Sequence, residues 1–91
     1  MNKILIVEDD PKINKMVQIL LRKNKYLSVP AFSGTEALLL LEKESFDLIL
    51  LDLMLPGLSG EKILTKINEQ FQIPVICVSA IEKNEQKHSG R

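Results

Sequence analysis

Four short, mostly apolar runs divide the chain and predict buried β-strands. They occupy residues 3–7, 27–32, 47–51 and 75–78 and are rich in Val, Ile and Leu. Such runs, without strict alternation of polar residues, are typical of parallel strands that are covered on both faces. Pro30 interrupts the second run. Because proline cannot donate a ladder hydrogen bond, we expect this strand at an edge of the sheet.

The segment after the first run has the periodicity of an amphipathic helix. Asp10 and Pro11 predict its start, because a carboxylate caps the free amides and proline suits the first helical position. The apolar positions repeat at helical spacing and form one stripe: Ile13, Met16, Val17, Leu20 and Leu21. We therefore expect this helix to pack on the sheet through that stripe.

Two further helices are predicted between the remaining runs. Ser33 and Glu36 match a capping box, in which the Glu36 carboxylate would reach back to the Ser33 amide. The helix that they open would end at about Glu44. Pro56 and Gly57 mark the loop before the third helix. The apolar side of that helix is formed by Ile63, Leu64 and Ile67.

The resulting order, β-α-β-α-β-α-β, predicts an α/β fold. Strands that alternate with helices form a parallel sheet with right-handed crossovers and helices on both faces. We expect one domain over residues 1–82 and a polar tail over residues 83–91, since no apolar residue follows Ile81. The sequence contains no internal repeat and no linker.

Composition narrows the possible partners. Hydrophobic residues make up 45% of the chain and charged residues 26%, as in ordinary globular proteins. Twelve basic residues balance twelve acidic ones, so no general attraction to nucleic acid or to an anionic membrane is expected. The basic residues within 12–25 are interpreted as a solvated helix face, because no aromatic side chains are interleaved with them. A single cysteine and the lack of a signal or membrane-length segment favour the cytoplasm.

Acidic residues follow two of the predicted strands. Glu8 and Asp9 follow the first and Asp52 follows the third, while Ser79 follows the fourth. Ligands of doubly wound sheets bind at the carboxyl ends of strands, so the three carboxylates converge if strands one and three are neighbours. Their mutual repulsion calls for a cation, and Mg²⁺ takes carboxylate oxygens, a carbonyl and waters. The backbone carbonyl of Met54 is placed to complete that set, and Ser79 offers a hydroxyl.

Each of these residues also has a purely structural explanation. An acid at a strand end is often a turn former or a helix cap, and this is our interpretation of Asp10. Glu8, Asp9 and Asp52 are interpreted as functional only jointly, because they follow two strands in the right order. Cys77 has apolar strand neighbours and is predicted to be an inert thiol of the core.

Four segments resemble the receiver domain of two-component response regulators. They are residues 4–10, 31–38, 47–60 and 74–80, and the third, DLILLDLMLPGLSG, is the most specific. The resemblance covers about residues 3–82 and implies a flavodoxin-like sheet of strand order 2-1-3-4, in agreement with Pro30 at an edge.

The resemblance also implies roles for the candidate residues. Glu8 and Asp9 are similar to the metal-binding acidic pair of the family, and Asp52 to the phosphoacceptor that is loaded by a sensor histidine kinase. Ser79 is similar to the switch hydroxyl that moves toward the phosphoryl group. These roles agree with the Mg²⁺ site expected from the residues themselves, with Glu8, Asp9, Asp52 and the Met54 carbonyl as ligands.

The chain departs from the family after the fourth strand. Family members continue through a fourth helix, a fifth strand that ends in a lysine, and a fifth helix, so we expect a C-terminally truncated receiver domain. Without the fifth strand and helix, strand four becomes an uncharged edge and one sheet face is uncovered. These features predict a homodimer through strand four or that face.

Two functions are therefore kept. The first is a phosphorelay receiver, which is a signalling module and no enzyme in its own right. The second is a phosphorylation-impaired receiver that acts only in protein interaction or dimerisation, which the missing lysine favours. A nucleotide-binding α/β enzyme is disfavoured, because acids and no glycine-rich phosphate loop follow the first strand. Labelling by a small phosphodonor would separate the first two.

Overall fold

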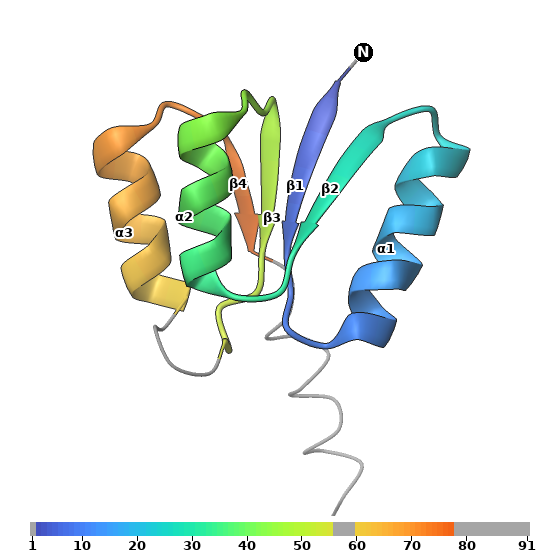
Figure 1. The fold of residues 1–91 in the computed structure, drawn as a ribbon, viewed down its shortest axis with the longest axis horizontal. Helices are drawn as coiled ribbons and strands as arrows, with labels where there is room; N and C mark the ends of the chain where they lie inside the picture. Colours follow the sequence, from blue (N-terminus) through green and yellow to red (C-terminus); the bar gives the residue numbers. More distant parts are fainter. Residues whose placement is uncertain (1, 56–59, 78–91) are drawn as a thin grey trace, which may run out of the picture.

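Strands and helices alternate along the chain as the apolar pattern predicts (Figure 1). The structure, a computed structural model, describes residues 2–55 and 60–77. The elements are β1 (Lys3–Val7), α1 (Pro11–Lys23), β2 (Leu27–Ala31), α2 (Gly34–Lys43), β3 (Leu48–Leu51), α3 (Gly60–Gln70) and β4 (Val75–Cys77). None of the described helices combines the length and the apolar character that a bilayer span requires.

The four strands form one parallel sheet in the order β2-β1-β3-β4. The predicted order is thus confirmed, and β2, which contains Pro30, lies at an edge. The register places Ile6 opposite both Pro30 and Leu50. It also places Val7 opposite Leu51, so β1 and β3 end side by side.

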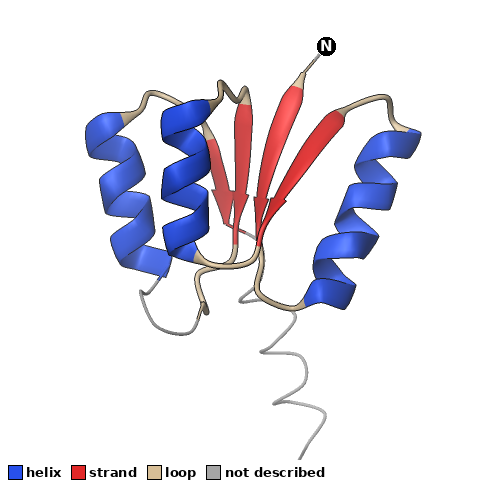
Figure 2. Cartoon of the chain, viewed as in Figure 1, coloured by secondary structure: helices blue, strands red, loops and turns tan. Residues whose placement is uncertain are grey.

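Helices flank the sheet on both sides (Figure 2). The main core is formed by strand residues together with apolar residues of α2 and α3, all 7% exposed or less: Leu5, Val7, Ile49, Leu51, Ala37, Leu41, Ile63 and Ile67. The alternate strand residues Ile6 and Leu50 face Ile13 and Val17 of α1. Each buried strand therefore uses both of its faces, as its continuous apolar sequence requires.

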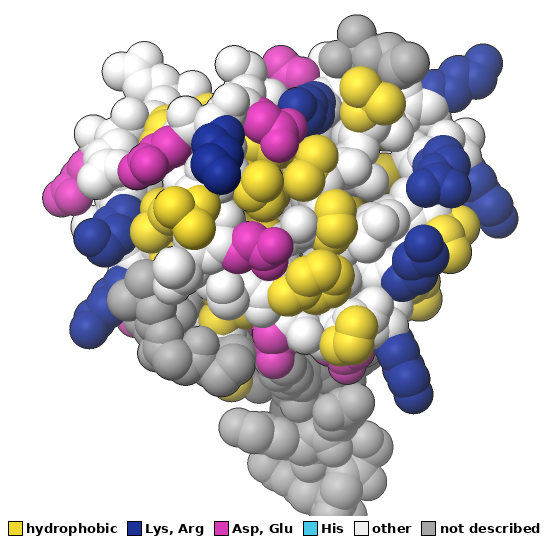
Figure 3. Space-filling model, viewed as in Figure 1, with side chains coloured by type: hydrophobic (Ala, Val, Ile, Leu, Met, Phe, Trp, Pro, Cys, Tyr) yellow, Lys and Arg dark blue, Asp and Glu magenta, His cyan; other side chains and the backbone are white. Residues whose placement is uncertain are grey.

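The predicted α1 stripe is wider than the side that the helix buries. Ile13 and Val17 lie toward the sheet, whereas Met16 is 54% exposed and Leu20 is 55% exposed. The basic residues of α1 are exposed, and Figure 3 shows Lys and Arg side chains along this edge of the molecule. Their interpretation as a solvated helix face agrees with this exposure.

Polar caps fix where α1 and α2 begin. Asp10 accepts hydrogen bonds from the backbone N–H groups of Lys12 at 2.8 Å and Ile13 at 3.4 Å, so its predicted capping role is confirmed. The Glu36 amide donates to Ser33 Oγ at 3.1 Å, as a capping box requires.

The reciprocal contact of the capping box differs from the prediction. The Glu36 carboxylate accepts from the Phe32 amide at 2.7 Å, one residue earlier than the Ser33 amide. The Ser33 backbone is extended (φ −153°, ψ 162°), which leaves the preceding amide within reach of the carboxylate.

The prediction of a buried Cys77 is wrong, because this thiol is exposed. Cys77 is the last described residue of β4, and β4 is an edge strand of the described sheet. An apolar neighbourhood in sequence does not bury a side chain when the strand has a partner on one side only. Ile76 is likewise 47% exposed.

Candidate metal centre

The candidate site is built where β1 and β3 end. Glu8 follows the last residue of β1, and Asp52 follows the last residue of β3. The Asp52 amide donates to the Val7 carbonyl at 2.9 Å, and the Glu8 amide donates to the Ala31 carbonyl at 3.0 Å. Both acids are therefore held by the continued strand ladder, which leaves little freedom in their backbones.

This arrangement brings three carboxylates together. Glu8, Asp9 and Asp52 each offer one oxygen, and the three oxygens lie within 4.8 Å of one another. Glu8 is 6% exposed and Asp52 is 1% exposed, while Asp9 is half-buried. The convergence predicted from two neighbouring strand ends is thus present in the structure.

The spacing of these oxygens fits a small hard cation. With oxygen ligands at about 2.1 Å, opposite ligands of an octahedral Mg²⁺ lie about 4.2 Å apart. The three carboxylate oxygens lie within 4.8 Å of one another, which is close to this spacing. Two of the three carboxylates are shielded from water, which strengthens their attraction for a cation.

Burial and repulsion between the carboxylates raise the pKa of Glu8. Burial is the largest cause that raises its pKa, and the neighbouring charge and side-chain contact of Asp52 raise it further. The Asp10 amide, which donates to Glu8 Oε2 at 3.0 Å, acts in the opposite direction. The balance raises the pKa of Glu8 from 4.5 to about 7. A bound cation would relieve this repulsion.

Asp52 is oriented by the chain that follows it. The Met54 amide donates to Asp52 Oδ1 at 2.7 Å, which restricts rotation of the carboxylate. The Met54 side chain is 50% exposed, so any contribution of this residue to a metal site comes from its backbone. The assignment of the Met54 carbonyl as a ligand stays a prediction.

A glycine allows the next helix to approach this loop closely. A Cβ atom added at Gly60, the first residue of α3, would lie 2.3 Å from Leu53 Cα. Such a contact is impossible between real atoms, so only glycine fits here without a backbone shift. Gly60 therefore allows α3 to hold the segment between Asp52 and Met54 closely.

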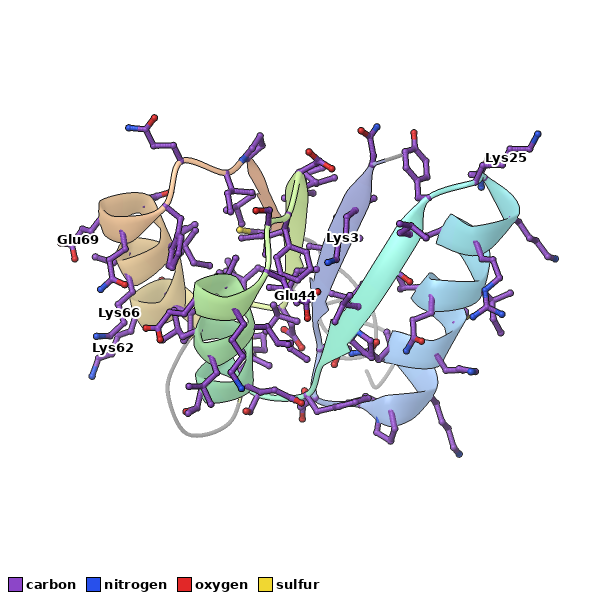
Figure 4. All side chains as sticks on the ribbon, turned by 45° about the horizontal axis from the view of Figure 1, so that its top comes forward. Lys3, Lys25, Glu44, Lys62, Lys66 and Glu69 are labelled. Carbon is purple, nitrogen blue, oxygen red and sulfur yellow. The ribbon has the colours of Figure 1, made fainter. Side chains whose placement is uncertain are left out.

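The remaining polar residues are considered one by one. Ser79 is outside the described residues, so its role as a hydroxyl of the site stays a prediction. Asp10 caps α1 through its side chain and reaches the acids only through its amide. Lys3 lies at the amino end of β1, away from the site, where it pairs with Glu44 (Figure 4).

Sequence reasoning missed one residue next to the acids. Asn14 is 0% exposed within α1, and its side chain donates to the Glu8 carbonyl at 3.0 Å. The signal that could have revealed it is the pair Asn14 and Gln18, two amides four residues apart beside the apolar stripe.

Comparison with known proteins identifies the family. Residues 4–90 match the family model of the response regulator receiver domain. The uncharacterized transcriptional regulatory protein YcbL of Bacillus subtilis is 42% identical over 86 residues, which are 94% of this chain and 38% of that protein. This chain therefore belongs to the response regulator receiver family.

Solved structures agree with this assignment. The receiver domain of the Francisella response regulator 1452 matches with a TM-score of 0.84 and 34% identity, over 99% of this chain and 75% of that chain. A complex of the histidine kinase ThkA with the response regulator TrrA contains a match with a TM-score of 0.83 and 31% identity, over 88% of this chain and 70% of that chain. The chain spans 38% of the length of YcbL.

Proposed function

We propose that this chain is a phosphorelay receiver, which takes a phosphoryl group onto Asp52 from the phosphohistidine of a sensor histidine kinase. The observation that carries the proposal is the convergence of Glu8, Asp9 and Asp52 at two neighbouring strand ends. The family match and a related regulator bound to a histidine kinase support it. The comparisons give no preference to a phosphorylation-impaired module over this function.

The proposed step is a single group transfer. A carboxylate oxygen of Asp52 attacks phosphorus, the bond between phosphorus and the imidazole nitrogen breaks, and the imidazole keeps the electron pair. An acyl phosphate on Asp52 results. The Met54 amide, at 2.7 Å from Oδ1, holds the carboxylate in one orientation during the attack. Each chain accepts one phosphoryl group, so it acts as a signalling module.

Mg²⁺ is the cofactor that we propose for this step. Glu8, Asp9 and Asp52 would hold it through carboxylate oxygens, together with the backbone carbonyl of Met54. The ion would neutralise charge on the transferring oxygens. We also propose that the Ser79 hydroxyl contacts the phosphoryl group, on the grounds that Ser79 follows β4 closely and β4 lies beside β3.

Labelling by acetyl phosphate in the presence of Mg²⁺ tests the proposed function. We expect the chain to take up label in a bond that hydroxylamine cleaves. In Asp52→Asn the amount of label should fall by about tenfold or more, because the reacting carboxylate is gone. Asp47→Asn is the matched control, because Asp47 is an exposed acid just before β3, at its other end. A folded parent chain that takes up no label would favour the phosphorylation-impaired alternative.

We further propose that two copies of the chain associate through β4 or the neighbouring sheet face. Val75, Ile76 and Cys77 carry no charge that would block edge pairing. An open groove of about 450 Å³ lies on the same sheet face as Ile76, lined mainly by apolar residues that include Ile4, Leu48 and Leu50. The formal net charge of zero leaves no long-range repulsion between copies.

The remaining expectations concern the cell. No direct contact with nucleic acid or membrane is proposed, because the charge of the chain is balanced and the basic residues of α1 form a solvated face. The cytoplasmic location expected from the sequence stays a prediction.

A further inference from the structure

Asn14 is a fully buried amide inside α1, at 0% exposure. Its Nδ2 donates to the Glu8 carbonyl at 3.0 Å and to the Ala31 carbonyl at 3.3 Å. Its Oδ1 accepts from Gln18 Nε2 at 3.0 Å. Both ends of the amide are therefore used, and the donor end joins the carboxyl ends of β1 and β2 to one helix.

From these contacts we infer that Asn14 is a positioning residue for the acidic pair, which fixes the peptide between Glu8 and Asp9. This inference rests on the proposed metal site. The Glu8 carbonyl belongs to the peptide from which both acidic side chains diverge. A hydrogen bond to this carbonyl sets the rotation of the peptide plane, and with it the direction of both side chains.

Three hydrogen bonds hold Glu8, at its amide, its carbonyl and its side chain. Its amide donates to Ala31, its carbonyl accepts from Asn14, and its Oε2 accepts from the Asp10 amide at 3.0 Å. The donors of the first and third contacts are backbone amides, which almost any residue at these positions would provide. The second depends on one side chain, so the sequence controls the position of the acidic pair through Asn14.

The chemistry of this position argues against simple filling of the core. Asparagine is a weak helix former, and a buried amide is stabilising only when its polar atoms are paired. A leucine would extend the apolar side formed by Ile13 and Val17. A carboxamide is one of the few side chains that can donate to two carbonyls and accept from Gln18 at once.

The test compares Asn14→Leu with Asn24→Leu in the full chain. Asn24 lies at the other end of α1 and makes the same kind of bond, from Nδ2 to the Leu20 carbonyl at 2.9 Å. We expect Asn14→Leu to weaken Mg²⁺ binding, measured by calorimetric titration, about tenfold, which is typical of outer-shell partners of metal ligands. Asn24→Leu should bind Mg²⁺ within twofold of the parent chain.

Amide hydrogen exchange of the metal-free protein gives a second measurement. The exchange rate of the Glu8 amide is divided by that of Leu5 in the centre of β1, because a loss of global stability raises both rates, whereas a local effect at the strand end raises only the Glu8 rate. This ratio should rise several-fold in Asn14→Leu and stay unchanged in Asn24→Leu. If the parent chain binds no Mg²⁺, the proposed metal site fails, and the exchange ratio still decides the role of Asn14.

A milder variant covers poor folding of Asn14→Leu. Gln18→Leu removes the bond to Asn14 Oδ1 at 3.0 Å and leaves both carbonyl contacts possible. It should change both measurements in the same direction by a smaller factor. A folded Asn14→Leu chain with the parent's exchange ratio would overturn the inference. So would a parent-like ratio in Gln18→Leu if Asn14→Leu does not fold.

Discussion

Glu8 combines 6% exposure with a charged neighbour, Asp52, and its pKa is raised to about 7 in the folded chain. The unfolded value is 4.5, so between these values the folded state binds more protons than the unfolded state. The contribution of Glu8 to the free energy of unfolding therefore falls as pH rises from about 4.5 to about 7. Above that range Glu8 is ionised in both states, and its destabilising effect on the metal-free fold has reached its full size.

Replacing this carboxyl with an amide should stabilise the metal-free protein. Glu8→Gln keeps the shape and the acceptor for the Asp10 amide but removes the repulsion with Asp52. At pH 8 without metal, we expect the variant to be more stable than the parent chain by about 2 kcal/mol, a difference that shrinks toward pH 5. Urea unfolding across this pH range measures it.

When Mg²⁺ is present, we expect the stability difference to reverse, so that Glu8→Gln is less stable than the parent chain. The cation stabilises the parent chain by binding its folded state, whereas Glu8→Gln lacks one of the proposed ligands and gains less. Glu42→Gln, an exposed acid of α2, serves as the control and should change neither measurement. A Glu8→Gln chain that Mg²⁺ stabilises as strongly as the parent would remove Glu8 from the ligand set.

Gly60 offers a second test at the scale of one residue. Gly60→Ala adds a Cβ that would lie 2.3 Å from Leu53 Cα, so the backbone must move. Overpacking of this kind costs on the order of 1–3 kcal/mol, even though alanine favours a helix. Thr65→Ala, at an exposed position of the same helix, should be neutral or slightly stabilising. Thermal unfolding of both variants decides, and equal melting temperatures would show that the loop yields.

At the scale of elements, the prediction succeeded where local chemistry decides the outcome. Pro30 places β2 at the edge because a missing donor has the same effect in any sheet. Asp10 caps α1 because the free amides of a helix start are fixed by the helix itself. The convergence of Glu8 and Asp52 follows from the parallel order once β1 and β3 are neighbours.

The prediction failed where tertiary context decides. Cys77 is exposed at the end of β4, although its sequence neighbours are apolar, and the edge position expected for this strand was not carried over to the burial of its side chains. The bonds of Asn14 to Glu8 and Ala31 join three elements, so periodicity along α1 cannot reveal them. The close approach of Gly60 to Leu53 is likewise a property of packing.

Asp10 is a structural acid, because it caps α1, and substitutions can distinguish it from the proposed metal ligands. Asp10→Ala removes the acceptor of the Lys12 and Ile13 amides and should cost about 1 kcal/mol of stability. Asp10→Asn keeps a good cap and should retain that stability. Because the Asp10 side chain is no ligand in our proposal, both variants should bind Mg²⁺ within about threefold of the parent chain. A tenfold loss in Asp10→Asn would place this carboxylate in the metal site.

For the molecule as a whole, the two ends of the sheet serve different purposes. The carboxyl ends of β1 and β3 gather the acids, while Lys3 pairs with Glu44 and lies 5.1 Å from the Phe46 ring centroid at the amino end. The Lys3–Glu44 ion pair therefore lies at the opposite end of the strands from the acids. Substitutions at Lys3 or Glu44 should therefore change stability without removing a proposed metal ligand.

The exposed edge strand β4 predicts that copies of the chain associate with one another. Ile76 is 47% exposed on β4 and lies opposite Leu50 in the register. We expect the chain to self-associate at high micromolar concentration, and Ile76→Lys to raise the dissociation constant at least tenfold, because an edge lysine opposes pairing. Leu39→Lys, at a 53% exposed position of α2, adds the same charge away from this edge and should leave association unchanged. Sedimentation equilibrium measures all three proteins, and a parent chain that stays monomeric at several hundred micromolar would contradict association through β4.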